Sequence, residues 1–166
     1  MSRRHPNVVN LDELPLQPSG QGGLSSRGAG VARAAGAELL GASIYVLEPG
    51  QAAFPHHWHS ANEEALFILD GTGTLRIGGD EVAVRAGDWA SFPRGLESAH
   101  QLVNTGASPL RYLCFSTMLS PELCGYPDSG KIATFYRKDG QVVFRGVFYE
   151  EEKRGYYDRE PKADAE

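Results

Sequence analysis

Residues 56–71 read HHWHSANEEALFILDG, and this stretch decides the fold of the 166-residue chain. His57 and His59 are separated by one residue, so their side chains lie on the same face of an extended strand. The small polar residues 60–62 can turn the chain, and residues 64–69 form an apolar run that ends at an Asp-Gly turn signal. The stretch therefore predicts a short strand, a turn and a buried strand, with two imidazoles on one face.

Two imidazoles at this spacing can bind one metal ion, and a carboxylate at the start of the apolar run, Glu63 or Glu64, could reach the same ion. His100 is a candidate fourth ligand. Three neutral imidazoles and one carboxylate, with no thiolate, disfavour a zinc knuckle or an iron–sulfur cluster. The set suits one divalent transition-metal ion, which could be Fe, Mn, Ni, Co or Zn.

A second stretch, residues 87–104, reads GDWASFPRGLESAHQLVN. Together the two stretches resemble the two sequence motifs of the cupin superfamily. The first motif runs Gly, His-any-His, Glu, Gly, and the matching residues are Gly50, His57, His59, Glu64 and Gly71. The second runs Gly, Pro-any-Gly, His, Asn, and the matching residues are Gly87, Pro93, Gly95, His100 and Asn104.

The chain departs from this pattern in two gaps. Six residues separate Gly50 from His57, where the motif has about five, so a strict count would start the histidine pair at His56. The partner of His56 would then be Trp58, which cannot bind a metal ion. The gap before the histidine of the second motif is also two residues longer than the motif's. The resemblance therefore assigns the metal ligands to His57, His59, Glu64 and His100.

The resemblance implies an all-β fold, the cupin double-stranded β-helix (a jelly-roll barrel), with a flanking N-terminal segment and a C-terminal hairpin. A narrower likeness, which includes residues 126–131 (YPDSGK), is to small bacterial cupins, some of which carry the label sugar-phosphate isomerase. It implies a metal-binding cupin that acts on or binds a small polar metabolite, and also a homodimer. The alternatives are a non-catalytic binding or sensor cupin and a mononuclear metal dioxygenase.

Four regions follow from the pattern of short apolar runs and turn signals. Residues 1–38 form an N-terminal extension, 39–120 the barrel core, 121–150 a turn and hairpin that completes or covers the barrel, and 151–166 a charged tail. In the first region, residues 8–11 predict an edge strand, 19–30 a loop, and 31–37 one helical turn. Strands are predicted at 42–48, 64–69, 74–77, 82–85, 88–92, 101–104, 110–116, 132–137 and 142–148.

Several further residues receive an expected role. Cys114 and Cys124 are interpreted as spare thiols, Asn104 as a residue that satisfies a turn, and residues 126–131 as a turn or, alternatively, a lid. The predicted pocket walls are Tyr45, Leu66, Ile68, Phe92, Leu102 and Phe115.

Charge and hydropathy exclude several classes of partner. The net charge is −5 and no basic stripe is present, which argues against nucleic acid. No run approaches eighteen apolar residues, and the basic N-terminus is not followed by the apolar segment of a secretory signal. We therefore expect a cytoplasmic protein without a membrane partner.

Overall fold

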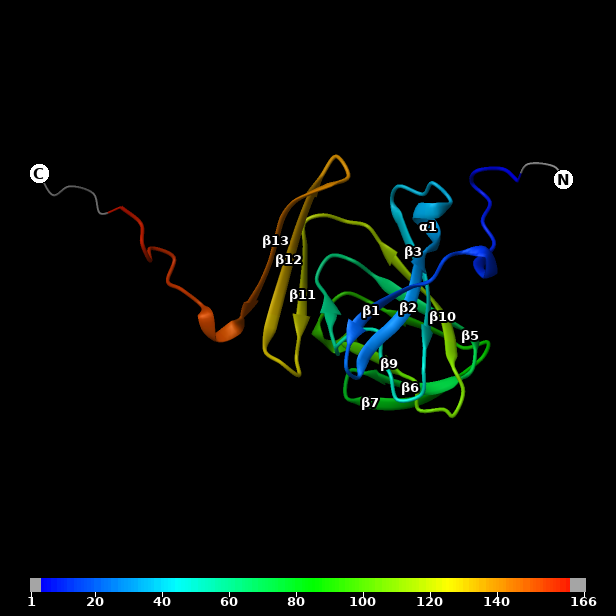
Figure 1. Cartoon of the computed structure of the whole chain (residues 1–166). Helices are drawn as coiled ribbons and strands as arrows, with labels where there is room; N and C mark the ends of the chain where they lie inside the picture. Colours follow the sequence, from blue (N-terminus) through cyan, green and yellow to red (C-terminus); the bar gives the residue numbers. More distant parts are fainter. Residues whose placement is uncertain (1–3, 162–166) are drawn as a thin grey trace, which may run out of the picture.

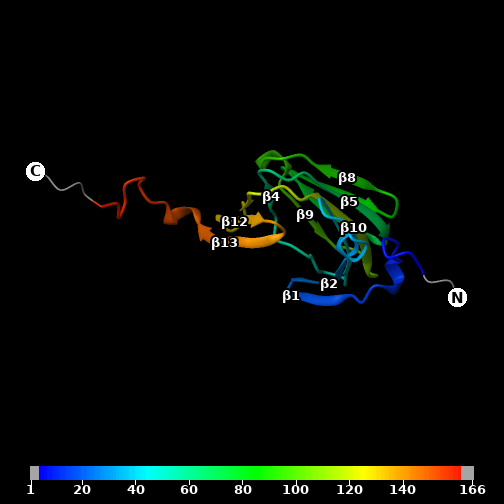
Figure 2. The same ribbon diagram turned by 90° about the horizontal axis from the view of Figure 1, so that it is seen from above.

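The regular structure is β almost throughout, as Figures 1 and 2 show. The computed structural model describes residues 4–161. Within them, no helix is long and apolar enough to cross a membrane. The helical elements are α1 (Val31–Ala34) and 3-10 turns at Leu11–Glu13, Leu96–Ser98 and Glu150–Glu152. The strands are β1 (Gln17–Gln21), β2 (Leu24–Gly30), β3 (Leu40–Leu47), β4 (Trp58–His59), β5 (Glu64–Asp70), β6 (Thr72–Ile77), β7 (Asp80–Arg85), β8 (Trp89–Phe92), β9 (His100–Val103), β10 (Leu110–Thr117), β11 (Glu122–Tyr126), β12 (Lys131–Lys138) and β13 (Gln141–Tyr149).

Two antiparallel sheets form the barrel. One has the strand order β1-β2-β3-β10-β5-β8, and the other has the order β7-β6-β9. The core cluster draws side chains from both sheets, so the two sheets pack face to face. Its members are Leu47, Leu66, Ile68, Leu75, Val84, Phe92, Leu102, Leu110 and Tyr112. This double-sheet arrangement is the predicted all-β jelly-roll barrel.

A third sheet, with the order β13-β12-β11-β4, joins the histidine pair to the C-terminal part of the chain. We call β11, β12 and β13 the ribbon. In Figures 1 and 2 the ribbon stands beside the barrel. It meets the barrel where Cys124 of β11 pairs with His59 and Gly125 pairs with Trp58. A Cβ atom at Gly125 would collide with the Trp58 indole, so this close approach requires glycine.

Turn chemistry accounts for the hairpins that the sequence predicts. Gly78 and Gly79 connect β6 to β7, and the β12–β13 hairpin turns at Asp139 and Gly140. Asp139 and Gly140 both have positive φ, of 52° and 75°. Such angles match the twist of a tight hairpin, and an Asp-Gly pair adopts them readily. Both hairpin predictions are confirmed.

Two predictions for the N-terminal region are wrong. Residues 8–11 form no strand, because the Asn10 side chain accepts a hydrogen bond from the Asp12 N–H and caps the 3-10 turn Leu11–Glu13. Residues 19–30 are not a loop, because most of them lie in β1 and β2, which pair with each other, and β2 also pairs with β3. The helical turn predicted at 31–37 is confirmed by α1.

Candidate metal centre

Strand alternation aims the predicted ligands into the barrel. Glu64 begins β5 and shares its inward face with Leu66 and Ile68, which are buried. His100 begins β9 and is buried, as is Leu102 two residues later. The backbones of His57 and His100 exchange two hydrogen bonds, of 3.1 and 2.8 Å. These strand contacts place His57 and His100 side by side, although they are far apart in the sequence.

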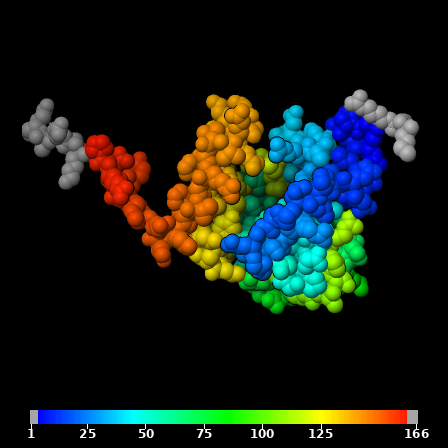
Figure 3. Space-filling view, viewed as in Figure 1, coloured from blue at the N-terminus to red at the C-terminus, as the bar shows by residue number. Residues whose placement is uncertain are grey.

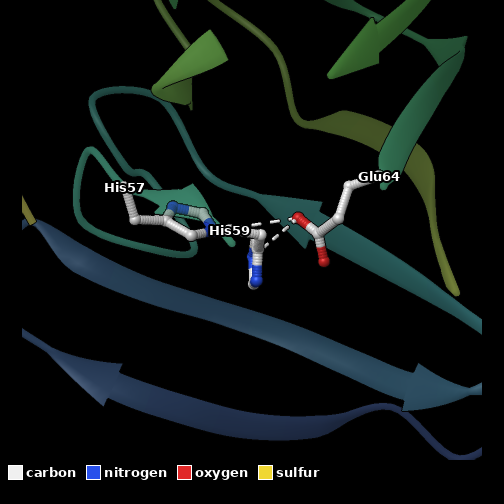
Figure 4. Close-up of side chains that lie close together, drawn as sticks. All are labelled: His57, His59 and Glu64. Atoms are coloured by element: carbon white, nitrogen blue, oxygen red, sulfur yellow. Dashed lines mark ion pairs between the residues drawn. The ribbon is translucent and has the colours of Figure 1, made fainter. Parts of the chain in front are cut away.

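The three predicted imidazoles converge on one oxygen of the fourth predicted ligand, Glu64. The Oε2 atom of Glu64 lies 3.8 Å from Nε2 of His57, 3.3 Å from Nε2 of His59 and 3.3 Å from Nε2 of His100. Figure 4 shows His57, His59 and Glu64 pointing toward one another. Ligand atoms of these three residues all lie within 4.8 Å of one another, as the donors of one metal ion must.

Backbone carbonyls set the tautomers of two of the histidines. Nδ1 of His57 lies 2.8 Å from the carbonyl oxygen of Pro55, and Nδ1 of His100 lies 3.0 Å from that of Ser98. Because a carbonyl can only accept, each Nδ1 carries the proton and donates it. The Nε2 atom of each ring then faces the Glu64 carboxylate: it donates to the carboxylate while the ring carries a second proton, and it presents a lone pair once that proton is lost. Lone pairs that converge in this way are suited to a cation, so the residues fit a metal ion.

Charge and burial shift the pKa values within this cluster. Burial raises the pKa of Glu64, but hydrogen bonds from His100, His57 and His59 outweigh it and hold the pKa well below the usual range. Burial lowers the pKa of His100, and the hydrogen bond to Glu64 compensates only in part. Glu64 is therefore an ionised carboxylate.

His59 has two partners behind it that the sequence reading did not identify. Its Nδ1 atom lies 3.2 Å from Sγ of Cys124 and 3.7 Å from Oε2 of Glu122. Burial lowers the pKa of His59, but hydrogen bonds to Cys124 and Glu64 outweigh it and raise the pKa to about 10. Cys124 is a free and buried thiol, as the sequence predicts, and its contact with His59 is the addition that the structure makes. The i, i+2 spacing of Glu122 and Cys124 on one strand was the available signal.

Glu122 anchors the loop between the histidine pair and Glu64. Its carboxylate accepts hydrogen bonds from the backbone N–H groups of Ser60, Ala61, Asn62 and Leu123, at 2.8–3.1 Å. The Ser60 hydroxyl and the Asn62 side-chain amide also donate to it. Burial raises the pKa of Glu122, but these bonds outweigh it and lower the pKa. Glu122 thus fixes the segment that carries the ligands.

A cavity of about 370 Å³ opens beside the four converging side chains. Figure 3 shows the molecule hollowed between the ribbon and the N-terminal strands of the barrel. Five of the six predicted pocket walls line it: Tyr45, Leu66, Phe92, Leu102 and Phe115. The prediction for Ile68 is wrong. Its side chain lies two residues beyond Leu66 on the same face of β5, where it is fully buried in the barrel core and does not reach the cavity. Tyr126, Phe135 and Arg137 bring the ribbon into the cavity wall.

Other residues singled out by the sequence lie outside the cluster. His56 faces Asp128 at 3.2 Å, and Glu63 is exposed. Asn104 is fully buried and donates to the carbonyl oxygens of Leu47 and Ser108, which confirms its role in holding a turn. Residues 126–131 form the turn between β11 and β12, closed by a 3.1 Å hydrogen bond from Ser129 N–H to the carbonyl of Tyr126.

Fold and site together define a small jelly-roll protein with a histidine-lined pocket. Residues 43–116 match the cupin domain family. Both predicted motifs overlap this match, which spans just under half of the chain. The chain is 31% identical over 71 residues to an uncharacterized protein of Methanocaldococcus jannaschii, an alignment that spans 43% of this chain and 48% of that protein.

Solved structures extend the likeness to nearly the whole chain. A proposed sugar phosphate isomerase from Acidithiobacillus ferrooxidans superposes with a TM-score of 0.79 at 23% identity, covering 90% of this chain and 96% of the other. A sugar phosphate isomerase of the cupin superfamily from Silicibacter pomeroyi gives 0.75 at 22% identity, with coverage of 91% and 98%. A predicted oxalate decarboxylase from Thermotoga maritima gives 0.56 at 24% identity, with coverage of 68% and 99%. At these identities the likeness shows the fold.

Proposed function

We propose that this cupin binds one divalent transition-metal ion through His57, His59, Glu64 and His100, and uses it to bind a small polar metabolite. The observation that carries the proposal is the convergence of three Nε2 atoms on one Glu64 oxygen. Nitrogen and oxygen donors of this kind suit Fe, Mn, Ni, Co or Zn. When bound, the ion would supply a Lewis acid that polarises an oxygen of the ligand.

The residues of the chain would hold the ion in a partly dry pocket. Carbonyl groups orient His57 and His100, and Cys124 and Glu122 orient His59. Phe92 stacks on the His100 ring with a centroid separation of 3.6 Å, which restricts access of water to that side. These contacts favour a preorganised site that would act on an oxygen-bearing metabolite, as in a sugar-phosphate isomerase or a mononuclear metal dioxygenase.

A second candidate function is binding without catalysis. Among the described residues, the carboxylates that line the cavity are Glu64 and Glu122. Glu64 is engaged by the histidines and Glu122 by backbone N–H groups. Neither is free to act as a general base, which favours a carrier or sensor role.

Metal analysis tests the proposal. Full-length protein expressed with each of the five metals should hold about one ion per chain. His100→Ala should lower the metal affinity about 100-fold or more, because it removes a direct ligand. His56→Ala is the matched control, since His56 faces Asp128, and it should leave the affinity unchanged. Protein that takes up no metal with all four side chains intact would overturn the proposal.

A metabolite screen then separates the two candidates. Turnover of a metabolite that disappears in His100→Ala would establish an enzyme and exclude the carrier. Thermal stabilisation by a metabolite without turnover would favour the carrier.

We also propose that two copies of the chain pair through the ribbon. Within residues 4–161, β13 has a neighbouring strand on one side only, so its other edge is open. Apolar side chains along β13 are about half exposed, among them Val142 at 54%, Phe144 at 51% and Phe148 at 47%. An open strand can pair with its own copy about a two-fold axis, which would close both edges at once. Sedimentation that shows a monomer at micromolar concentration would contradict this.

A further inference from the structure

Several polar side chains of the cavity wall are already engaged within the chain. Gln101 accepts a hydrogen bond from Arg76 at 2.9 Å and donates one to the carbonyl of Phe54 at 2.9 Å. Thr117 donates its hydroxyl proton to the side-chain oxygen of Asn62 at 3.0 Å. These groups are used to hold the wall together and have little left to offer a ligand.

The same holds for the serines at the ribbon side. Ser116 donates to the carbonyl of Thr117 at 2.8 Å. The Ser120 hydroxyl donates to the carbonyl of Arg137 at 3.1 Å and accepts from the Arg137 N–H at 2.7 Å. The hydroxyl groups of Thr117, Ser116 and Ser120 are therefore engaged within the chain.

Arg137 supplies a positive charge at the cavity wall. It is the only lysine or arginine among the described residues that line the cavity. Its backbone is held by Ser120, but within residues 4–161 its guanidinium group has neither an ion pair nor a hydrogen bond. The side chain is exposed at the cavity wall, where it offers a positive charge and several donors to an anion.

Several aromatic rings line the cavity. Tyr45 stacks on Tyr112 with centroids 5.5 Å apart and meets Phe54 edge to face at 5.3 Å. Phe115 and Phe135 also line the cavity. Rings of this kind bury the apolar body of a ligand.

We propose that the cavity takes a small carboxylate with an aromatic or alkyl body, whose negative charge is recognised by Arg137. The inference narrows the ligand class of the proposed function and rests on it for the metal end of the cavity. A sugar phosphate also carries an anion, but its hydroxyl-bearing body matches the aromatic and aliphatic side chains of the wall less well than an aromatic or alkyl body does. A volume of about 370 Å³ lies within the range of small-molecule sites.

Calorimetry on the metal-loaded full chain tests the proposal with three probes: phenylacetate, its neutral isostere phenylacetamide, and ribose 5-phosphate. Phenylacetate should bind at least about tenfold more tightly than either of the others. Arg137→Gln should weaken phenylacetate binding about tenfold and leave phenylacetamide unchanged, and Arg137→Lys should restore part of the loss. Arg85→Gln is the matched control, because Arg85 is exposed on β7 outside the cavity wall.

Tighter binding of ribose 5-phosphate, or equal weakening of phenylacetate and phenylacetamide by Arg137→Gln, would overturn the inference. Thermal unfolding of each variant shows whether it has folded. The metal titration is carried out first, so a chain that binds no metal contradicts the proposed function alone. The preference for phenylacetate and its dependence on Arg137 are then measured on the metal-free chain, where their absence contradicts this inference as well.

Discussion

The barrel and the ribbon use the same strand chemistry with opposite results. In the barrel, Ile68 and Leu110 are completely buried between two sheets. In the ribbon, Val147 and Phe148 of β13 are 55% and 47% exposed, because no second sheet within the described residues covers them. Apolar strands become a core only where another layer lies against them. The two sheets of the barrel supply that layer for each other, whereas no layer among the described residues covers the apolar side chains of β13.

The largest effect is expected where the two regions are joined. Glu122→Ala should lower the free energy of unfolding by roughly 3–5 kcal/mol, because it leaves the buried N–H of Asn62 and the part-buried N–H groups of Ser60 and Ala61 without an acceptor. Denaturant unfolding measures the loss. Glu63→Ala changes an exposed carboxylate in the same segment and should cost less than about 0.5 kcal/mol. Equal losses would show that Glu122 does not anchor the loop.

The next two substitutions compare how much a core side chain and a ribbon side chain contribute to the free energy of unfolding. Ile68→Ala should lower the free energy of unfolding by roughly 2–5 kcal/mol, since it opens a cavity in a close-packed core. Val143→Ala in β13, where the side chain is 59% exposed, should cost within about 0.5 kcal/mol at concentrations where the chain is monomeric. Both are measured by denaturant unfolding of dilute protein. A comparable cost at Val143 would mean that the ribbon has a core of its own.

A smaller effect on stability and a clear effect on assembly are expected from the double variant Phe144→Ser with Phe148→Ser. Both side chains are about half exposed, so their loss should spare the barrel but remove apolar area from the proposed pairing surface. Sedimentation should show a dimer for the original chain and a monomer for the variant at the same micromolar concentration. A variant that remains dimeric would place the interface away from the ribbon.

The last prediction is a dependence of stability on pH in the metal-free protein. The pKa of His59 is about 10 in the folded chain, above the ordinary value of 6.5. Protonated His59 therefore stabilises the fold. The contribution is complete at pH values below the pKa of His59 in the unfolded chain, about 6.5, and it is lost as the pH rises from there through about 10. Unfolding of chelator-treated protein should show this decline, and Glu64→Gln should flatten it because it removes a partner of His59. An unchanged slope in Glu64→Gln would contradict the assignment.

Local signals made much of the barrel predictable. The hairpins at residues 78–79 and 139–140 follow from glycine at positions that need positive φ. Local sequence does not predict β1, β2 and β11, because these segments become strands through pairing with neighbouring strands. The Ser- and Gly-rich β2 is held by pairing with β3, and Gly28 allows the Tyr45 ring to lie directly against its backbone.

The candidate site divides in the same way. His57, His59 and Glu64 could be grouped from the sequence, since alternation along a strand and a short turn bring near neighbours to one face. His100 was paired with them through the resemblance to a family motif, and the hydrogen bonds between His57 and His100 supply the physical link.

The sequence by itself determined an all-β chain with histidines and a carboxylate gathered near one turn, because backbone geometry acts over a few residues. Only the tertiary structure decided that Cys124 and Glu122 stand behind His59 and that Arg137 borders the cavity. These residues come from the ribbon. Their positions depend on the register of β11 against β4, which is set by packing such as Trp58 over Gly125 and not by any local pattern.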